Sequence, residues 1–216
     1  MFRRAPSSLP AAQWGEVQLL ELAQLRRADW HALYALYRDP ELARLNAAEP
    51  TRIPRWLFRL LLLAEQGRER MSFGVMVGGQ LVGNAELYDF SPARPGWPTR
   101  ATLGVMLARP HWGRGHGQDT LNALLAWGFG AGHFSAGPGG MDPPLERVQL
   151  STLASNGRAQ LAFARAGFQE RGRSHRRGHT EIQMELRRSD WLARQLPGLI
   201  SPAESDDRLP PNGEPA

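Results

Sequence analysis

The 216-residue sequence contains no cysteine. Disulfide bonds, thiolate metal sites, iron–sulfur clusters and cysteine nucleophiles are therefore excluded, and a reducing compartment, the cytoplasm, is the expected location. Purely apolar runs are also short, such as residues 60–64. A membrane-spanning helix needs about 20 apolar residues, so no membrane partner is expected.

Lysine is absent as well, because all 26 basic residues are arginines. Against 21 acidic residues they give a formal net charge of +5. Such a balance is typical of proteins that bind nucleic acids or anionic membranes, but here the arginines are scattered, with the densest run at residues 171–177. A genome-wide compositional bias explains this distribution better, so nucleic acid is not an expected partner.

The length of the chain predicts one domain with short additions. We expect a flexible N-terminal segment over residues 1–12, a single domain over residues 13–196 and a disordered tail over residues 197–216. The tail contains several prolines and acidic residues but few large apolar side chains. Burial would therefore not offset the entropy lost on ordering it.

Hydrophobic periodicity divides the domain into strands and helices. Strands are predicted at residues 16–22, 72–77, 81–90, 101–108 and 147–152, with a terminal hairpin formed from residue 168 onward and residues 180–186. Helices are predicted from an N-cap at Asp29 to Pro40, from about Pro54 to Gly67, from a glycine cluster to about Phe129, and over residues 156–166. Residues 130–144 are rich in glycine and proline and predict a long loop.

The glycine cluster follows the strand at residues 101–108 and reads Trp112-Gly113-Arg114-Gly115-His116-Gly117-Gln118. A strand that leads through glycines into an amphipathic helix presents bare backbone N–H groups where the helix dipole favours negative charge. The cluster therefore predicts an anion-binding turn, with a plain glycine-rich turn as the alternative. A Walker A loop is excluded because it needs lysine, and a dinucleotide GxGxxG motif fails at Gln118.

This cluster resembles the pyrophosphate loop of the GNAT superfamily of acyl-CoA-dependent N-acetyltransferases, whose pattern is Q/R-x-x-G-x-G/A. Gly115 and Gly117 fill its two small positions, and Trp112 stands where many members have Gln or Arg. The form Trp-Gly-x-Gly is similar to the branch of ribosomal-protein N-terminal (alanine or serine) acetyltransferases. A second block matches the N-x-x-A/S…GF pattern of the family: Asn156, Ala159, Phe163 and Gly167-Phe168. The order of predicted elements is a third agreement.

The resemblance implies an α/β fold, the GNAT acyl-CoA N-acyltransferase fold. Its mostly antiparallel sheet of about six to seven strands splays between the fourth and fifth strands and is flanked by about four helices. The resemblance also implies acetyl-CoA as co-substrate, without a metal or a protein nucleophile, and an oxyanion held by a backbone N–H of the fourth strand. The residues that it places against the co-substrate are Val105, Met106, Leu107, Gly113, Arg114, Gly115, His116, Gly117, Gln118 and Asn156.

The catalytic groups of the family are matched only in part. Many relatives place a carboxylate early on the fourth strand, where this sequence reads Ala101-Thr102-Leu103. Glu86 is the nearest candidate general base, with Glu49 and Asp89 behind it, and an exposed strand carboxylate is the alternative interpretation of Glu86. Relatives that protonate the leaving thiolate use a tyrosine where this chain has Phe163, so no general acid is identified.

The implied function is acetyl transfer to a primary amine by direct attack in a ternary complex. A protein or peptide N-terminus is the first choice of acceptor, because its pKa of about 7.7 lies well below the value of about 10.4 for a lysine side chain. The alternatives are a small amine of the aminoglycoside or polyamine type, against which the net positive charge argues weakly, and a non-catalytic acyl-CoA- or RNA-associated module that uses residues 171–177. Whether the protein forms a homodimer stays open.

Two further expectations concern side chains. The apolar residues of the second helix, Trp56, Leu57, Leu60 and Leu61, are expected in the core, with the wall of an acceptor groove as the alternative. His111 and His116 flank the glycine cluster without acidic or cysteine neighbours at metal-ligand spacing, so no metal site is expected there. His116 is expected to face solvent, with a contact to phosphate as the alternative.

Overall fold

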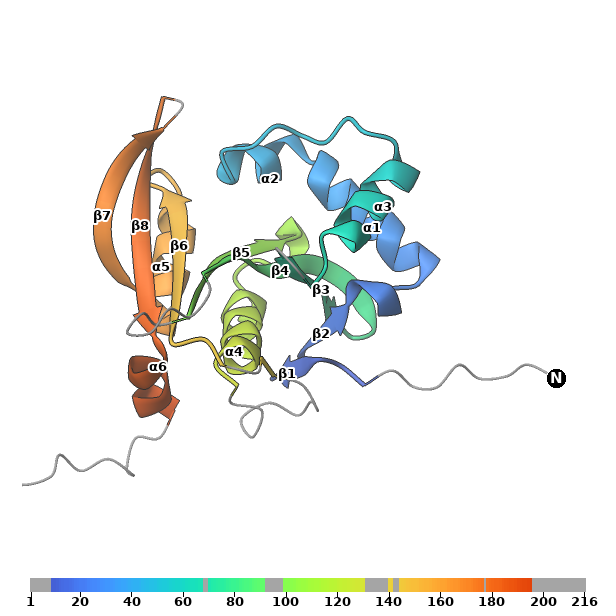
Figure 1. Ribbon diagram of the computed structural model, residues 1–216. Coiled ribbons are helices and arrows are strands. Elements are labelled where there is room, and N and C mark those ends of the chain that lie inside the picture. Colours follow the sequence, from blue (N-terminus) through green and yellow to red (C-terminus); the bar gives the residue numbers. More distant parts are fainter. Residues whose placement is uncertain are drawn as a thin grey trace, which may run out of the picture.

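The computed structural model describes residues 9–67, 70–91, 99–130, 140–141, 144–176 and 178–195. Within them, one sheet has the strand order β1-β2-β3-β4-β5-β6-β8-β7 (Figure 1). The strands are β1 (Ala12–Trp14), β2 (Val17–Glu21), β3 (Arg70–Val77), β4 (Gln80–Ser91), β5 (Arg100–Leu107), β6 (Arg147–Leu153), β7 (Gln169–Arg176) and β8 (His179–Arg187). All neighbouring strands are antiparallel except β5 and β6, which are parallel. The predicted mixed, mostly antiparallel sheet is confirmed.

Helices cover both faces of this sheet. The α-helices are α1 (Arg27–Arg38), α2 (Pro40–Leu45), α3 (Arg55–Ala64), α4 (His116–Gly128), α5 (Gly157–Ala166) and α6 (Arg188–Gln195), and the 3-10 helices are η1 (Leu22–Gln24) and η2 (Arg109–His111). In Figure 1, α4 lies on one side of β1–β5 and α1–α3 lie on the other. Each side has its own apolar core, one around Leu121 and Leu124 of α4 and one around Trp30 and Leu33 of α1.

Besides the two short 3-10 helices, the described residues contain three elements that the periodicity did not predict: β1, α2 and α6. Pro40 ends α1 as predicted, but it also begins α2, because the Asp39 carboxylate accepts hydrogen bonds from the amides of Glu41 and Leu42. The prediction that Asp29 is an N-cap is wrong. Asp29 lies inside the first turn of α1, where its carboxylate accepts from the backbone amide and the guanidinium of Arg26.

The prediction that the apolar residues of α3 lie in the core is wrong for most of them. Trp56, Leu60 and Leu61 are 69%, 56% and 45% exposed. The buried side chains are Phe58 and Leu62, which pack toward α1 in the second core. Eight of the ten residues of α3 are apolar, so several of them stay exposed whichever face is buried.

The sheet opens between β5 and β6, as the fold prediction implied. Their parallel pairing is limited to the first residues of each strand, from Arg100 opposite Arg147 to Thr102 opposite Gln149. Beyond Thr102 the edge of β5 has no partner strand among the described residues, while β6 continues to Leu153 beside β8. The fold therefore leaves a cleft along the second half of β5.

Several expectations fall outside the described residues: the tail at residues 197–216, most of the loop at residues 130–144, and residues 1–8 of the N-terminal segment. In the part of the chain that is described, no helix combines the length and the apolar character that crossing a membrane would require.

Candidate active site

Two cavities of about 300 and 310 Å³ open along β5 where the sheet splays. We call the cavity that the glycine cluster lines cavity one, and the cavity that Glu86 lines cavity two. The residues that line both are Leu45, Asn46, Val105, Met106, Asn156, Ala159 and Phe163. A molecule in one cavity can therefore meet a molecule in the other along the open edge of β5.

The glycine cluster forms an open turn at the N-terminus of α4. Gly113 and Gly115 have φ angles of +73° and +87°, in the left-handed region that favours glycine. A Cβ atom added to either residue would meet no heavy atom within 4 Å. The glycines are therefore needed for the backbone conformation, and the space above the turn is open to a ligand.

The amide groups of this turn are available to an anion. Among the described residues, the amides of residues 113–117 have no backbone acceptor, while the next two amides, of Gln118 and Asp119, donate to the carbonyl of Gly115. Unpaired N–H groups at a helix N-terminus carry partial positive charge and bind phosphate readily. The geometry therefore supports the predicted anion-binding turn.

The open edge of β5 directs backbone groups into the cleft. The Ala108 amide donates to the carbonyl of Val82 on β4, so strand alternation turns the backbone groups of Val105 and Leu107 the other way. The carbonyl of Leu107 is already bonded, because the indole Nε1 of Trp112 donates to it at 2.7 Å. The N–H groups of Val105 and Leu107 and the carbonyl of Val105 are directed into the cleft.

Asn156 lines both cavities and is also the N-cap of α5. Its Oδ1 accepts a hydrogen bond from the amide of Ala159 at 3.3 Å. Sequence reasoning assigned this residue only to the co-substrate, although an Asn before a helical segment is also a capping signal. Its side-chain NH₂ group has no partner among the described residues and remains available to a ligand in the cleft.

The expectation that His116 faces solvent is wrong, because only 7% of this residue is exposed. Its Nδ1 lies 3.2 Å from Nδ1 of His111, and its Nε2 lies 3.5 Å from a carboxylate oxygen of Glu16. Burial, and then the charges of His116 and Arg114, lower the pKa of His111. The described residues contain no group of three or more His, Cys, Asp and Glu side chains arranged to hold a metal ion.

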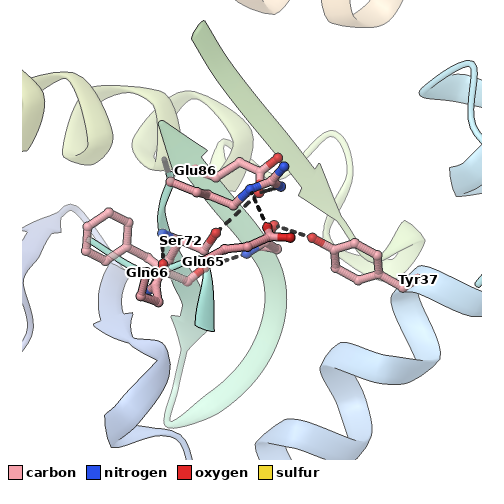
Figure 2. Close-up of polar contacts among 8 residues, drawn as sticks. Tyr37, Glu65, Gln66, Ser72 and Glu86 are labelled. Carbon is pink, nitrogen blue, oxygen red and sulfur yellow. Dashed lines mark hydrogen bonds and ion pairs between the residues drawn. The ribbon is translucent and has the colours of Figure 1, made fainter. Parts of the chain in front are cut away.

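Glu86 is not an exposed strand carboxylate, since its side chain is 15% exposed and lines cavity two. Its Oε2 accepts from the guanidinium of Arg70 at 2.8 Å and from the hydroxyl of Ser72 at 3.3 Å. Its Oε1 lies above Gly104 on β5, where an added Cβ would be 3.0 Å away. Figure 2 shows Glu86, Ser72 and Glu65 close together, with Tyr37 on the side of α1.

Tyr37 also lines cavity two, and sequence reasoning did not find it. Its hydroxyl donates to Oδ1 of Asn84 at 3.0 Å, and Nδ2 of Asn84 donates to the carbonyl of Phe73. Burial, and then the charge of Glu86, raise the pKa of Tyr37, so the hydroxyl stays protonated and is a weak proton donor. The general acid therefore remains unidentified.

The two cavities carry opposite charge. Cavity one is lined by Arg158 and Arg165 and by no carboxylate among the described residues. Cavity two is lined by Glu49, Glu86 and Glu181 and by no arginine among them. The weak argument from net charge against a cationic acceptor therefore does not hold locally. Asp89, the other carboxylate considered near Glu86, does not line either cavity.

The dense arginine run lies outside the cleft, on β7. Arg173 pairs with Glu170 at 2.8 Å, and Arg171 lies 3.7 Å from a carboxylate oxygen of Glu185. Arg177 lies outside the described residues. Part of this run is therefore neutralised by carboxylates of the same hairpin, which weakens the case for a nucleic-acid surface.

Comparison with known proteins agrees with this geometry. The family model described as "Acetyltransferase (GNAT) domain" matches residues 20–169. The solved structure of a spermidine N-acetyltransferase from Vibrio cholerae, in complex with CoA and spermine, superposes with a TM-score of 0.65 at 19% identity, covering 82% of this chain and 98% of that chain.

Two further solved structures are similar. A putative acetyltransferase from T. thermophilus has a TM-score of 0.61 at 21% identity, covering 86% of this chain and 94% of its own. A GNAT-family acetyltransferase from Bacillus anthracis has a TM-score of 0.61 at 13% identity, covering 82% and 98%. At these identities the likeness concerns the fold. No curated protein matches the sequence.

Proposed function

The chain belongs to the acetyltransferase (GNAT) domain family and is an N-acetyltransferase, and from that premise we propose that it acetylates a primary amine of a small cationic acceptor, with acetyl-CoA as donor. The proposal rests on the different charges of the side chains that line the two cavities. Cavity one offers arginines and free backbone amides to a polyanionic donor, and cavity two offers three glutamates to a cationic acceptor. The reacting ends would meet at their common wall on β5.

Acetyl-CoA supplies an acetyl group that is already activated as a thioester, so a neutral amine can attack it without a protein nucleophile. The free amides of residues 113–117 fit its diphosphate. The NH₂ group of Asn156 and the free backbone groups of Val105 fit the amides of the pantetheine arm. An N–H of Val105 or Leu107 would stabilise the oxyanion, because it is directed into the cleft before the reaction begins.

Glu86 is the candidate general base. Arg70 and Ser72 hold its Oε2, which leaves Oε1 to accept a proton from the acceptor amine, directly or through one water. Gly104 beneath Oε1 supports this role, since any larger residue there would press on the carboxylate. The N–H groups of β5 that would stabilise the oxyanion lie on the strand next to Glu86.

An acceptor with more than one positive charge, of the polyamine type, fits cavity two best. Glu49 and Glu181 line the cavity in addition to Glu86, so a second ammonium group would find a carboxylate away from the reacting amine. A peptide N-terminus is the second candidate. It is favoured by the lack of a carboxylate early on β5, since an α-amino group needs less help to lose its proton.

A screen of acceptors tests the proposal, with acetyl-CoA as donor and release of the free thiol as the signal. We expect kcat/KM to be highest for amines with two or more positive charges and to fall as salt is added. The variant Glu181→Gln should raise KM for such amines several-fold, whereas Glu170→Gln, on the same hairpin but outside cavity two, should not. Peptides that react faster than every polyamine would favour the second candidate, and no turnover with either class would contradict the proposal.

A further inference from the structure

Arg158 and Trp112 form a stacked pair in the lining of cavity one. The guanidinium carbon of Arg158 lies 3.2 Å from the centroid of the indole ring. The indole is itself held in place, because its Nε1 donates to the carbonyl of Leu107 at 2.7 Å. The pair therefore joins the first turn of α5 to the end of β5, across the cavity that the glycine cluster lines.

The position of Arg158 is unfavourable for the protein without a ligand. It is the second residue of α5, where the positive end of the helix dipole repels a cation. No carboxylate of the described residues forms an ion pair with it, and burial lowers the pKa of its guanidinium. A cation that is kept against these local preferences indicates an anionic ligand as its partner.

The surroundings of Arg158 provide other groups that bind anions and none that repel them. Gly113, Gly115 and Gly117, whose amides have no backbone acceptor among the described residues, line the same cavity, together with Arg165. No carboxylate lines this cavity within the described part of the chain. A phosphate that rested on the glycine cluster would therefore meet the guanidinium without competition from an acidic side chain.

We infer that Arg158, held over the indole of Trp112, binds a phosphate group of the acyl-CoA donor and makes the enzyme selective for phosphorylated donors. This inference rests on the proposed use of acetyl-CoA. A planar guanidinium can donate two parallel hydrogen bonds to phosphate oxygens while its face stays on the indole. The phosphate is either the diphosphate or the 3′-phosphate of the adenosine, which share this chemistry. Trp112 is the positioning residue of the pair.

The test compares the wild type with Arg158→Gln, which keeps a planar group beside the indole and removes the charge. The donors are acetyl-CoA, acetyl-dephospho-CoA, which lacks the 3′-phosphate, and acetyl-pantetheine, which lacks both phosphate groups. For acetyl-CoA we expect Kd, measured by calorimetry, to rise roughly 10- to 100-fold. We expect kcat to change little and KM for acetyl-pantetheine to stay the same.

The donor series identifies which phosphate is bound. If Arg158→Gln loses affinity for acetyl-CoA alone, Arg158 binds the 3′-phosphate. If the variant loses affinity for both CoA donors, Arg158 binds the diphosphate. Both outcomes support the inference. An equal loss of affinity for all three donors, or no loss of affinity for any of them, overturns the inference. If the variant unfolds, Arg158→Lys provides the same test, because it retains the charge but not the planar fork and should lose less affinity than a neutral residue.

Arg59→Gln is the matched control. Arg59 also stacks on an indole, with its guanidinium 5.3 Å from the ring centroid of Trp30, but it lines neither cavity of the cleft. Its replacement should leave the affinity for all three donors unchanged. Measurements on the wild type distinguish a failure of the proposed function from a failure of the role of Arg158. If it binds acetyl-CoA no better than acetyl-pantetheine, the proposed function fails, whereas a strong preference that survives Arg158→Gln overturns the role of Arg158 alone.

Discussion

Cavity one and cavity two share the open edge of β5, yet their linings differ in charge and in the source of that charge. Cavity one combines backbone amides of a helix N-terminus with side chains of α5, and cavity two gathers carboxylates from three separate parts of the chain. A net charge of +5 therefore says little about the charge inside cavity two. Exposed charges are screened beyond about 8 Å at physiological salt, so the local lining decides which ligand is attracted.

The largest expected effect comes from placing negative charge in cavity one. Gly117 is the second residue of α4, and a Cβ added there would meet only a methyl group of Leu107, at 3.8 Å. In Gly117→Glu we expect Kd for acetyl-CoA to rise about 1000-fold, or about 4 kcal/mol, because the carboxylate would face phosphate. The free energy of unfolding should be unchanged or higher, since an acidic residue suits a helix N-terminus better than glycine.

Gly117→Ala is the control for this prediction. It should give the same gain in helix stability and a loss of affinity of less than about tenfold, because it adds volume without charge. Calorimetry and thermal unfolding of the two variants separate charge from shape. Equal affinities of the Glu and Ala variants would contradict the assignment of anionic ligands to cavity one.

The next largest effect should come from Glu86→Gln, which removes the candidate base in cavity two. The amide oxygen can still accept from Arg70 and Ser72, so the local structure should persist. We expect kcat to fall about 100-fold and the acidic limb of the pH–rate profile to disappear. Glu65→Gln is the control, because Glu65 pairs with the same arginine at 3.2 Å but lies outside both cavities. A profile unchanged in shape and height would exclude Glu86 as the base.

A smaller effect is expected at the wall between the cavities, where Asn156 caps α5 and lines both cavities. Asn156→Ala should lower the free energy of unfolding by about 1 kcal/mol, because the N-cap of α5 is lost. Asn156→Ser keeps a cap and should be close to the wild type in stability. Both variants remove the NH₂ group from the cleft, so both should weaken acetyl-CoA binding several-fold. Wild-type affinity in the Ser variant would limit Asn156 to its capping role.

The smallest effect concerns His111 in cavity one. Its lowered pKa means that the unfolded chain takes up a proton, below about pH 6.5, that the folded protein does not. This contribution to stability is therefore present above that pH and is lost as the pH falls through the folded pKa. Phosphate bound nearby would raise the pKa of His111, so acetyl-CoA binding should be accompanied by proton uptake as the pH falls toward the pKa of this imidazole. Calorimetry in buffers of different ionisation enthalpy measures this proton uptake. No proton uptake in the wild type, or the same proton uptake in His111→Gln, would contradict the prediction.

The parts of the structure that could be predicted depend on local signals. The strand–turn–helix around the glycine cluster follows from apolar periodicity and from glycines that adopt positive φ. The hairpin between β3 and β4 follows from Gly78 and Gly79, which both have positive φ. The short helix α2 was missed because a proline that ends one helix can also be the first residue of the next.

The rest depends on contacts between distant residues. Glu49, Glu86 and Glu181 come from the segment after α2, from β4 and from β8, so only the folded chain brings them to one cavity. Arg158 shows no signal in the sequence either, because its proposed role depends on its contact with Trp112 and on a cavity lining without carboxylates among the described residues. Spacing along the chain predicted the glycine-rich turn that lines part of cavity one, because that turn is one contiguous segment.

A crystal structure of the protein grown with acetyl-CoA and an unreactive acceptor analogue, such as a polyamine whose terminal nitrogens are quaternary trimethylammonium groups, tests the central claim most directly. The account predicts the diphosphate on the amides of residues 113–117, the thioester beside Val105, and the cationic end of the analogue among the glutamates of cavity two. Density for the donor in cavity two, or for the analogue among the arginines of cavity one, would contradict it.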